Sequence, residues 1–378
     1  MSYSNVQDHR SMAFDKVRNQ AYEKAMASRI SADSVVMDLG AGVGIHGLMA
    51  AQLGAQRVYL VETEDVIWAA DAIARSNEWG SRVHCYQGAI EEVTLPEPPG
   101  LPGLVDMIIS VFTGNFLLEE DLLPSLFYAR DRYLKPNGFL LPSRGKMVAA
   151  PVCAPELHDR EIGVWSEYLS IDFSRARRYA ANTLIYDSEA LSKAVFLADP
   201  RTLLELDFYT CQNPSCHVEV VYAITESGLC HGWAGWFDME LGDEWLSTDP
   251  RREKMHWSAV MLPLDPPIRL TAGDEVSFRF SRPVHGEWSW WVRAGSVTQQ
   301  HSSAFSTPFG RETIVKRATH YQPALSPRGQ AWRDLLARFD GTTTLEEMAE
   351  FLLANYPSLY RTREHALQTI NDLVRQCA

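Results

Sequence analysis

Two hydrophobic patterns alternate along the first third of the chain. Short, nearly continuous apolar runs, typical of strands buried on both faces, are separated by segments whose apolar residues lie three or four positions apart, as on helices with one buried face. An amphipathic segment at 8–28 precedes the first run and predicts a helix. Such alternation forms a doubly wound parallel sheet, so residues 1–142 are predicted to be an α/β domain. The pattern places strands at 35–39, 57–62, 82–86 and 105–110 and helices at 45–53, 65–76 and 121–133.

The pattern changes after Pro142. Between 143 and 300, apolar and polar residues alternate singly, as in 218–222 and 276–280. This period of two predicts an antiparallel β domain, either a barrel or a sandwich. An insertion at about 155–195 looks helical instead and is rich in Arg and Tyr. We expect it to be an arm used for dimerisation.

The last part of the chain predicts a small helical domain. Residues 301–327 hold many Ser, Thr and Pro without a clear period and are expected to be a linker. In the domain that follows, 328–378, Thr344 precedes Glu347 by three positions, which is the capping-box pattern of a helix start. The expected helices are 331–339, 345–355 and 364–376.

Glycines follow the first predicted strand directly, at Gly40, Gly42 and Gly44. They let the backbone turn sharply and let a ligand approach closely. The next strand ends in Glu62, and a carboxylate there can accept both hydroxyls of a ribose. A plain turn would explain the glycines alone, but strand, helix and Glu62 together favour nucleoside binding. The Gly-x-Gly-x-Gly spacing after Asp38 favours S-adenosylmethionine over a dinucleotide, because this ligand has an amino-acid tail and no pyrophosphate.

Other segments that follow strands are expected to converge on this loop. Ligands of doubly wound sheets lie at the carboxyl ends of the strands. Segments 88–91 and 110–114 both follow strands, as Glu62 does. Glu91 could accept a hydrogen bond from an adenine amino group. The alternative is an exposed carboxylate at a helix start, stabilised by the helix dipole.

Two sets of charged residues allow two interpretations each. Three acidic residues, 119–121, either form the first turn of the predicted helix or place one carboxylate against the methyl acceptor. Asp15 and Arg18 lie three residues apart on the first predicted helix. They either form a solvated ion pair, or Arg18 faces the carboxylate of the ligand.

Composition excludes some classes of partner. The chain has 378 residues, enough for two or three domains, and a net charge of −13. This charge argues against nucleic acid and is compatible with a cationic or neutral peptide. No apolar run is long enough to span a membrane, and residues 1–5 lack the features of a signal peptide. A cytoplasmic setting is therefore expected.

The cysteines do not predict a metal site. In a cytoplasmic setting all six are expected to be reduced. A zinc site could be drawn from Cys211, Cys216, His217, Cys230 and His231. The Cys-x4-Cys spacing lies outside the usual range, however, and the residues lie in strand-like sequence. No metal is expected.

In order and spacing, these motifs resemble those of the protein arginine methyltransferases over about the first 300 residues. The resemblance implies a Rossmann-like methyltransferase domain followed by a β-barrel with a dimerisation arm. It also implies an S-adenosylmethionine-dependent enzyme that forms a homodimer. The matching parts are the opening helix with Met12, Asp15 and Arg18, the loop 36–44, Glu62, the segments 88–93, 106–110, 116–120 and 133–134, and 246–250 followed by His256 and Trp257.

The resemblance also implies roles for individual residues. Two would be catalytic: Glu120, as the second glutamate of the family's double-glutamate loop, and His256, as the histidine of its Thr-His-Trp loop. The implied cofactor-binding residues are Arg18 for the methionine carboxylate, Asp38, Gly40, Gly42 and Gly44 in the loop, Glu62 for the ribose, and Ile90 and Glu91 for the adenine.

The implied substrate pocket, which includes Trp257, departs from the family pattern at three positions. The first loop glutamate falls on Val111, the tyrosine beside the loop glycine on Asn115, and the threonine of Thr-His-Trp on Met255. The N-terminal segment with paired tyrosines is reduced to little more than Tyr3. Two glutamates clamp a guanidinium by bidentate, charge-assisted bonds. Losing one partner of a buried cation should cost roughly several kcal/mol.

The predicted acceptor is therefore a group other than arginine on a peptide or protein, and a nitrogen is favoured. An imidazole, an amide, an amine and a carboxylate are all candidates. The proton of a nitrogen acceptor would leave to Glu120 or His256. Three alternatives stay open: an arginine N-methyltransferase with an altered loop, a small-molecule methyltransferase, and an inactive cofactor-binding adaptor. The glycine spacing disfavours a nicotinamide dehydrogenase.

The tail shows a second, shorter resemblance. Residues 339–349 and the helices around them resemble PqqD-like peptide-recognition domains. These winged-helix modules hold leader peptides of ribosomally made natural products, so the resemblance implies such a precursor as the substrate. A generic helical cap is the alternative.

Overall fold

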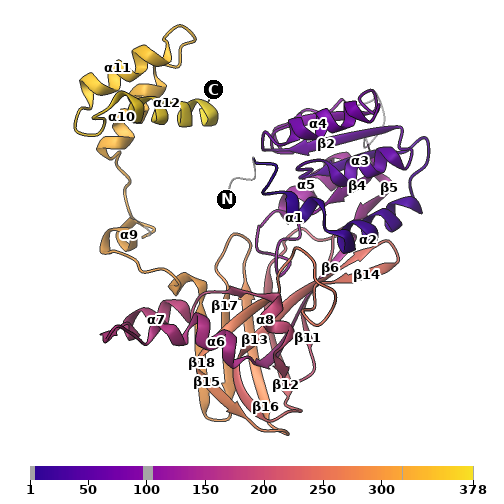
Figure 1. Cartoon of the computed structure of the whole chain (residues 1–378), viewed down its shortest axis with the longest axis vertical. Coiled ribbons are helices and arrows are strands. Elements are labelled where there is room, and N and C mark those ends of the chain that lie inside the picture. The colour runs from indigo at the N-terminus through magenta and orange to yellow at the C-terminus, as the bar shows by residue number, and fades with distance from the viewer. Residues whose placement is uncertain (1–4, 97–104, 317, 378) are drawn as a thin grey trace. The chain divides into compact units, whose positions relative to one another are not determined.

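The structure is a computed structural model that describes residues 5–96, 105–316 and 318–377 (Figure 1). The prediction on Tyr3 lies outside these residues. The chain divides into two compact units between Pro308 and Phe309. The first unit contains an α/β domain and a β domain. The second, called the tail unit below, contains helices.

The α/β domain is built on a parallel sheet of five strands in the order β3-β2-β1-β4-β5. The doubly wound sheet is thus confirmed. The sequence pattern missed the fifth strand, because Pro136, Asn137 and Gly138 within it are turn-forming residues. The strands are β1 (Val35–Leu39), β2 (Arg57–Glu62), β3 (Val83–Gln87), β4 (Val105–Ser110) and β5 (Leu134–Leu141).

Helices cover both faces of this sheet. The chain moves in opposite directions along the sheet from β1 to β3 and from β4 to β5. Right-handed connections therefore place two helices on one face and the third on the other. The first face carries α3 (Ile45–Gln52) and α4 (Ile67–Ser76), and the other carries α5 (Leu123–Tyr133).

The single helix predicted at 8–28 is wrong. The structure has a short α1 (Arg10–Ala13) and a longer α2 (Lys16–Ala27). The break lies at Asp15, whose side chain caps α2 by accepting a hydrogen bond from the Arg18 amide at 3.0 Å. A residue with an extended backbone and a capping carboxylate begins a helix and cannot lie inside one.

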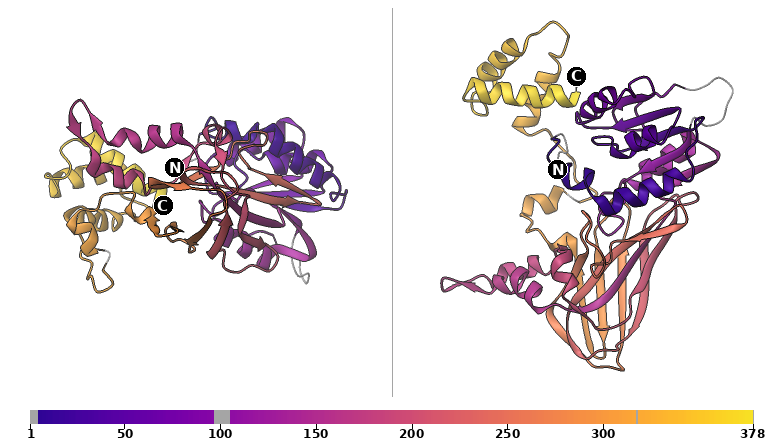
Figure 2. Two further views of the ribbon diagram at one scale, coloured as in Figure 1. Left: turned by 90° about the horizontal axis from the view of Figure 1, so that it is seen from below. Right: turned by 45° about the vertical axis from the view of Figure 1, so that its right-hand side comes forward.

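The β domain is antiparallel, as predicted. It contains one sheet of seven strands, β10-β6-β13-β15-β9 with β11 and β14 added, and one of four strands, β12-β16-β17-β18. Figure 2 shows its long strands side by side. The strands are β6 (Arg144–Cys153), β9 (Ile185–Tyr186), β10 (Val195–Phe196), β11 (Arg201–Asp207), β12 (Cys216–Ala223), β13 (Gly228–Leu241), β14 (Glu244–Ser247), β15 (Val260–Leu270), β16 (Glu275–Arg282), β17 (Ser289–Ala294) and β18 (Val297–Ser302).

The predicted arm at 155–195 projects from the β domain (Figures 1 and 2). It is not wholly helical, because a two-stranded hairpin lies between its helices. Several apolar side chains near this hairpin are exposed, including Leu169 and Ile171. The elements are α6 (Pro155–Glu161), a 3-10 turn (Gly163–Trp165), β7 (Glu167–Tyr168), β8 (Ile171–Asp172), α7 (Ser174–Ala180) and α8 (Ser188–Ser192).

One hydrophobic core is shared by the α/β domain and the β domain. Tyr22 of α2 is fully buried at their junction. Its hydroxyl donates to the Ser110 carbonyl at 2.9 Å and contacts the Met239 sulfur at 3.7 Å. The end of β4 and the N-terminal helices are therefore fixed against the β domain.

The tail unit has its own core, with Leu335, Leu352 and Ile370 buried. The predicted capping box is confirmed: Thr344 and Glu347 bond reciprocally. The linker predicted at 301–327 contains the end of β18 and a short helix. Among the described residues no helix is long and apolar enough to cross a membrane. The helices of the unit are α9 (Arg311–Lys316), α10 (Pro327–Leu336), α11 (Leu345–Asn355) and α12 (Arg363–Cys377).

Candidate active site

The glycine loop connects β1 to α3 through three residues with positive φ: Gly40 (69°), Gly42 (54°) and Gly44 (81°). Residues other than glycine rarely adopt these φ angles. A Cβ on Gly40 would lie 2.3 Å from the Phe112 ring. The Gly42 amide donates to the Glu62 carboxylate at 2.8 Å, which ties the loop to the end of β2. The predicted convergence of loop and carboxylate is therefore present.

The segment after β3 adjoins the same edge of the sheet. The Gly88 amide donates to the Glu62 carbonyl at 2.9 Å. Ile90 is buried and Glu91 is exposed, in a turn that no helix continues within the described residues. The interpretation of Glu91 as a residue of a helix start is thus wrong. Both residues follow Gly88, whose bond to Glu62 brings the start of this segment to the end of β2.

Asp38, at the end of β1, is a buried carboxylate with an unused oxygen. Its Oδ2 accepts from the Gly47 amide at 2.7 Å, while its Oδ1 has no partner in the described part of the chain. Burial raises the pKa of Asp38 from its ordinary 3.8 to about 7. A buried acceptor without a partner is costly, so this oxygen is available to a ligand that brings a donor or a positive charge.

We expect Asp38→Asn to stabilise the ligand-free protein at high pH by a few kcal/mol, since one pKa unit corresponds to about 1.4 kcal/mol. Because the folded pKa lies above the unfolded one, the folded state binds the proton more tightly. The stability that protonated Asp38 gives the wild type is therefore lost as pH rises through about 7. Asparagine does not ionise. Denaturant unfolding at about pH 5 and about pH 8 measures the difference. Equal pH dependence in both proteins would contradict this interpretation of Asp38.

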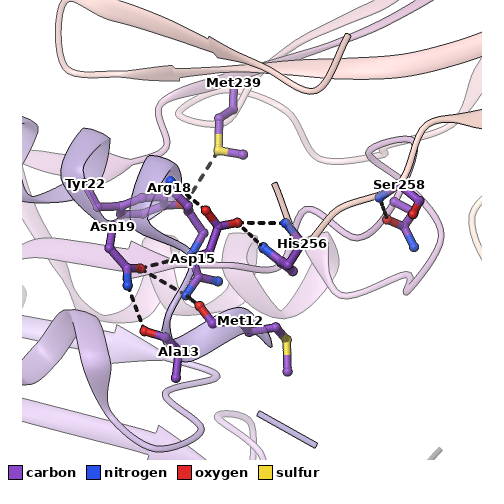
Figure 3. A network of polar contacts seen from close by, with 10 residues as sticks. Met12, Ala13, Asp15, Arg18, Asn19, Tyr22, Met239, His256 and Ser258 are labelled. Carbon is purple, nitrogen blue, oxygen red and sulfur yellow. Dashed lines mark hydrogen bonds and ion pairs between the residues drawn. The ribbon is translucent and has the colours of Figure 1, made fainter. Parts of the chain in front are cut away.

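Asp15 and His256 form a buried pair across the two domains (Figure 3). Asp15 Oδ2 accepts from the His256 amide and from His256 Nδ1, both at 2.8 Å. Burial opposes ionisation of Asp15, but the bonds from His256 and from the Arg18 amide lower its pKa overall. Burial lowers the pKa of His256. An ionised Asp15 thus faces a neutral imidazole, which donates through Nδ1 and keeps a lone pair on Nε2.

Arg18 is buried on α2 beside this pair. Its guanidinium donates to the Met12 carbonyl at 2.5 Å and to the Asn19 side chain at 3.2 Å, and lies 5.8 Å from the Trp257 ring. Among the described residues no carboxylate bonds to its guanidinium, and burial lowers its pKa. The solvated ion pair with Asp15 is therefore wrong. A buried cation of this kind suits an anionic ligand.

The loop 110–121 follows β4 and is held in turns. Phe116, Leu117 and Asp121 have positive φ, which is unusual for residues other than glycine. Glu119, Glu120 and Asp121 precede α5 instead of forming its first turn, so that interpretation is wrong. Partly buried Val111 lies at the start of the loop.

The three acidic residues differ in their surroundings. Glu119 lies close to Tyr186, and burial and then the charge of Glu119 raise the pKa of that tyrosine. Arg282, at the end of β16, donates to Asp121 Oδ2 at 2.6 Å and to the Leu118 carbonyl at 3.1 Å. Glu120 is exposed, although nearby protein atoms reduce the hydration of its carboxylate. This reduced hydration, and then the charge of Glu119, raise its pKa. Glu120 is therefore the carboxylate left for an acceptor.

The remaining pocket residues lie where the two domains meet. The Asn115 side-chain oxygen accepts from the Ser258 amide at 2.8 Å, which joins the loop to the 255–258 segment. Met255 and Trp257 are buried. The loop that holds Asn115 and the 255–258 segment, which are far apart in sequence, are thus brought together. Among the described residues no group of side chains is arranged as a metal site.

Two residues near the site were missed by sequence analysis. Arg282 contacts the loop from 161 positions away, and no local signal marks it. His46, the second residue of α3, is buried with an unpartnered Nε2. A polar ring two positions after the glycine loop was a signal that could have found it.

Comparison with known proteins gives consistent matches. Residues 143–290 match the family described as "Arginine methyltransferase oligomerization subdomain". Protein arginine N-methyltransferase 6 of Xenopus tropicalis is 32% identical over 289 residues, covering 73% of this chain and 83% of the relative. Protein arginine N-methyltransferase 1 of Schizosaccharomyces pombe is 29% identical over 283 residues, covering 73% and 81%.

Solved structures of protein arginine methyltransferases also match this chain. The PRMT1 enzyme–prozyme heterotetrameric complex of Trypanosoma brucei with AdoHcy matches with a TM-score of 0.70 and 25% identity, over 80% of this chain and 99% of that one. Protein arginine methyltransferase 10 of Arabidopsis thaliana matches with a TM-score of 0.67 and 23% identity, over 80% and 99%, and supports the fold.

Proposed function

The chain belongs to the protein arginine methyltransferase family and is an S-adenosylmethionine-dependent methyltransferase, and from this premise we propose that it methylates a nitrogen other than that of arginine, on a peptide or protein. The observation that carries the proposal is Val111, which lies at the end of β4 where the family pattern has its first loop glutamate. An imidazole or an amine is the acceptor that fits best.

The loop supports this proposal through the acceptor groups that it leaves for a substrate. A guanidinium has five N–H donors and is held best by two carboxylates. Asp121 is engaged by Arg282, and the Asn115 oxygen accepts from Ser258. Glu119 lies close to Tyr186 and raises its pKa. Glu120 remains as a carboxylate for the acceptor, and the position of the family's first loop glutamate is the apolar Val111. One carboxylate and one apolar wall suit a nitrogen with a single proton to lose.

Each reacting group has a defined task in the proposed reaction. When bound, S-adenosylmethionine supplies a methyl group on a positively charged sulfur, which keeps the electron pair of the broken bond. The acceptor nitrogen forms the new bond with its lone pair, gains the positive charge and becomes neutral again by losing its proton. Glu120 accepts that proton, and the free Nε2 of His256 is a second base. Asp15 holds the His256 ring in place.

The residues around the glycine loop fit this cofactor. Buried Arg18, without a carboxylate partner, suits the methionine carboxylate, and the unpartnered Asp38 Oδ1 suits the ammonium group. Gly40, Gly42 and Gly44 give the loop the positive φ angles that its turn requires. Glu62 would bind the ribose, and Ile90 and Glu91 would contact the adenine, as the resemblance implies.

We also assign the tail unit a role in holding the peptide. It is compact, and it exposes apolar side chains such as Leu336 and Leu345. Its described residues, 309–316 and 318–377, contain no strand. A leader segment would therefore pack against helices and would not extend a sheet. A ribosomally made precursor peptide remains the proposed type of substrate.

A homodimer formed through the arm is part of the proposal. We expect Leu169→Asp and Ile171→Asp each to shift the protein toward monomer, because these side chains are 77% and 57% exposed at the arm hairpin and would be buried in a dimer. Light scattering after size-exclusion chromatography measures the mass. Val221→Asp, at an exposed site on β12, is the matched control. Unchanged mass in both arm variants would refute the role of the arm.

The acceptor can be found with labelled cofactor and peptides. Matched peptides that differ only in one central residue, His, Lys, Asn or Arg, are incubated with the protein, and the methylated residue is located by mass spectrometry. We expect transfer to a histidine or lysine nitrogen. Transfer confined to arginine would overturn the proposal. Methylation of none, together with intact cofactor binding, would favour an inactive adaptor.

A further inference from the structure

Two buried side chains beside the glycine loop each have a polar atom without a partner among the described residues: Asp38 Oδ1 and His46 Nε2. They are linked through α3, since the residue after His46 donates its amide to Asp38. The charge of Arg18 acts on both. Asp38 and Arg18 already fit the two ends of an amino-acid group. This arrangement leaves His46 without a contact to the ligand.

The His46 ring is held on the side of α2 that carries Arg18. It stacks on the Tyr22 ring, with centroids 4.3 Å apart and planes 24° apart. Tyr22 lies four residues after Arg18, so both side chains project from the same face of α2. The residue is 2% exposed. The ring therefore lies between α2 and α3, close to the Arg18 guanidinium.

The charge state of this ring follows from its surroundings. Burial, and then the positive charge of Arg18, lower the pKa of His46 well below its ordinary value. The imidazole is neutral and offers one N–H and one lone pair. A buried N–H without a partner loses the free energy of a hydrogen bond, and such atoms are rare unless a ligand or water satisfies them.

We propose that His46 is a ligand of the amino-acid end of S-adenosylmethionine, donating a hydrogen bond from Nε2 to the carboxylate that Arg18 also holds. The three side chains then form a complete site for a zwitterion. Arg18 and His46 donate to the carboxylate, and Asp38 accepts from the ammonium group. This inference rests on the cofactor and is independent of the acceptor.

The competing explanation is that His46 only fills space against Tyr22. In that case an apolar side chain of similar size would serve as well. The two explanations predict different effects on ligands with and without the carboxylate. A packing defect weakens every ligand of the pocket, whereas a lost hydrogen bond weakens only ligands that carry the carboxylate.

Calorimetric titration of the full chain with two ligands tests the proposal. S-adenosylhomocysteine carries the amino-acid group, and 5′-methylthioadenosine has the same adenosine and thioether but lacks it. We expect His46→Leu to weaken S-adenosylhomocysteine binding about 10- to 100-fold, the factor for a hydrogen bond to a charged group, and to leave methylthioadenosine binding within about twofold. His46→Gln, whose amide can place a donor near the same point, should recover part of the loss.

Arg18→Met is the positive control and should show the same selective loss. In the double variant with His46→Leu the two losses should not add, because both residues bind one carboxylate. An equal weakening of both ligands by His46→Leu, or no weakening of either, would overturn the proposal. If His46→Leu does not fold, His46→Asn against His46→Gln gives the same comparison, since the shorter amide does not reach.

Discussion

Replacing the Glu120 carboxylate by an amide, in Glu120→Gln, is expected to lower kcat by about 10²- to 10⁴-fold. The acceptor nitrogen must lose a proton, and no hydrogen bond or ion pair from another described side chain engages the Glu120 carboxylate. Because reduced hydration, and then the charge of Glu119, raise the pKa of Glu120, the wild-type rate should fall as pH drops through that raised pKa, since a protonated carboxyl cannot accept a proton. Single-turnover rates measured across pH give both quantities.

Glu119→Gln is the matched control for this prediction. It makes the same change one residue away, at a carboxylate that lies close to Tyr186. We expect it to cost less than about tenfold in kcat, and we expect both variants to bind S-adenosylhomocysteine as the wild type does. A larger loss in Glu119→Gln than in Glu120→Gln would move the catalytic role to the neighbouring residue.

Val111→Glu is expected to raise the methylation of arginine peptides by about 10²- to 10³-fold, the factor that corresponds to roughly 3–4 kcal/mol for a buried charge pair. The new carboxylate would face Glu120 and complete a bidentate clamp for a guanidinium. Without a substrate, two adjacent carboxylates repel each other, so this variant should also be less stable than the wild type.

Val111→Gln separates charge from shape. Glutamine has nearly the size of glutamate but cannot pair with a cation, so it should leave arginine methylation close to the wild-type level. A comparable gain in both variants would mean that Val111 limits arginine through its volume and not through the missing charge.

The parts of the fold that depend on local sequence were predicted correctly. The glycine loop and the capping box at Thr344 follow from a few neighbouring residues, so their chemistry is visible in the sequence. Strand β5 was missed because its turn-forming residues outweigh its apolar ones. Its pairing with β4 supplies the stability that its own sequence lacks.

Features that depend on distant partners could not be predicted from pattern. The helix break at Asp15 is coupled to His256, which lies 241 residues away. His256 donates two hydrogen bonds to the Asp15 carboxylate. The turn around Asp121 is fixed by Arg282. The sequence near Asp15 fits one continuous helix equally well. His46 differs, because its position next to the glycine loop was visible but its unpartnered nitrogen was not.

The family to which the chain belongs makes arginine the natural first substrate to test, and Val111 is the residue that sets this chain apart from that expectation. The direct measurement is the methylarginine content of peptides after the same short reaction with the wild type and with Val111→Glu, determined by hydrolysis and mass spectrometry. We expect at most a trace of methylarginine from the wild type and about 10²- to 10³-fold more from the variant. Robust dimethylarginine formation by the wild type would contradict this expectation.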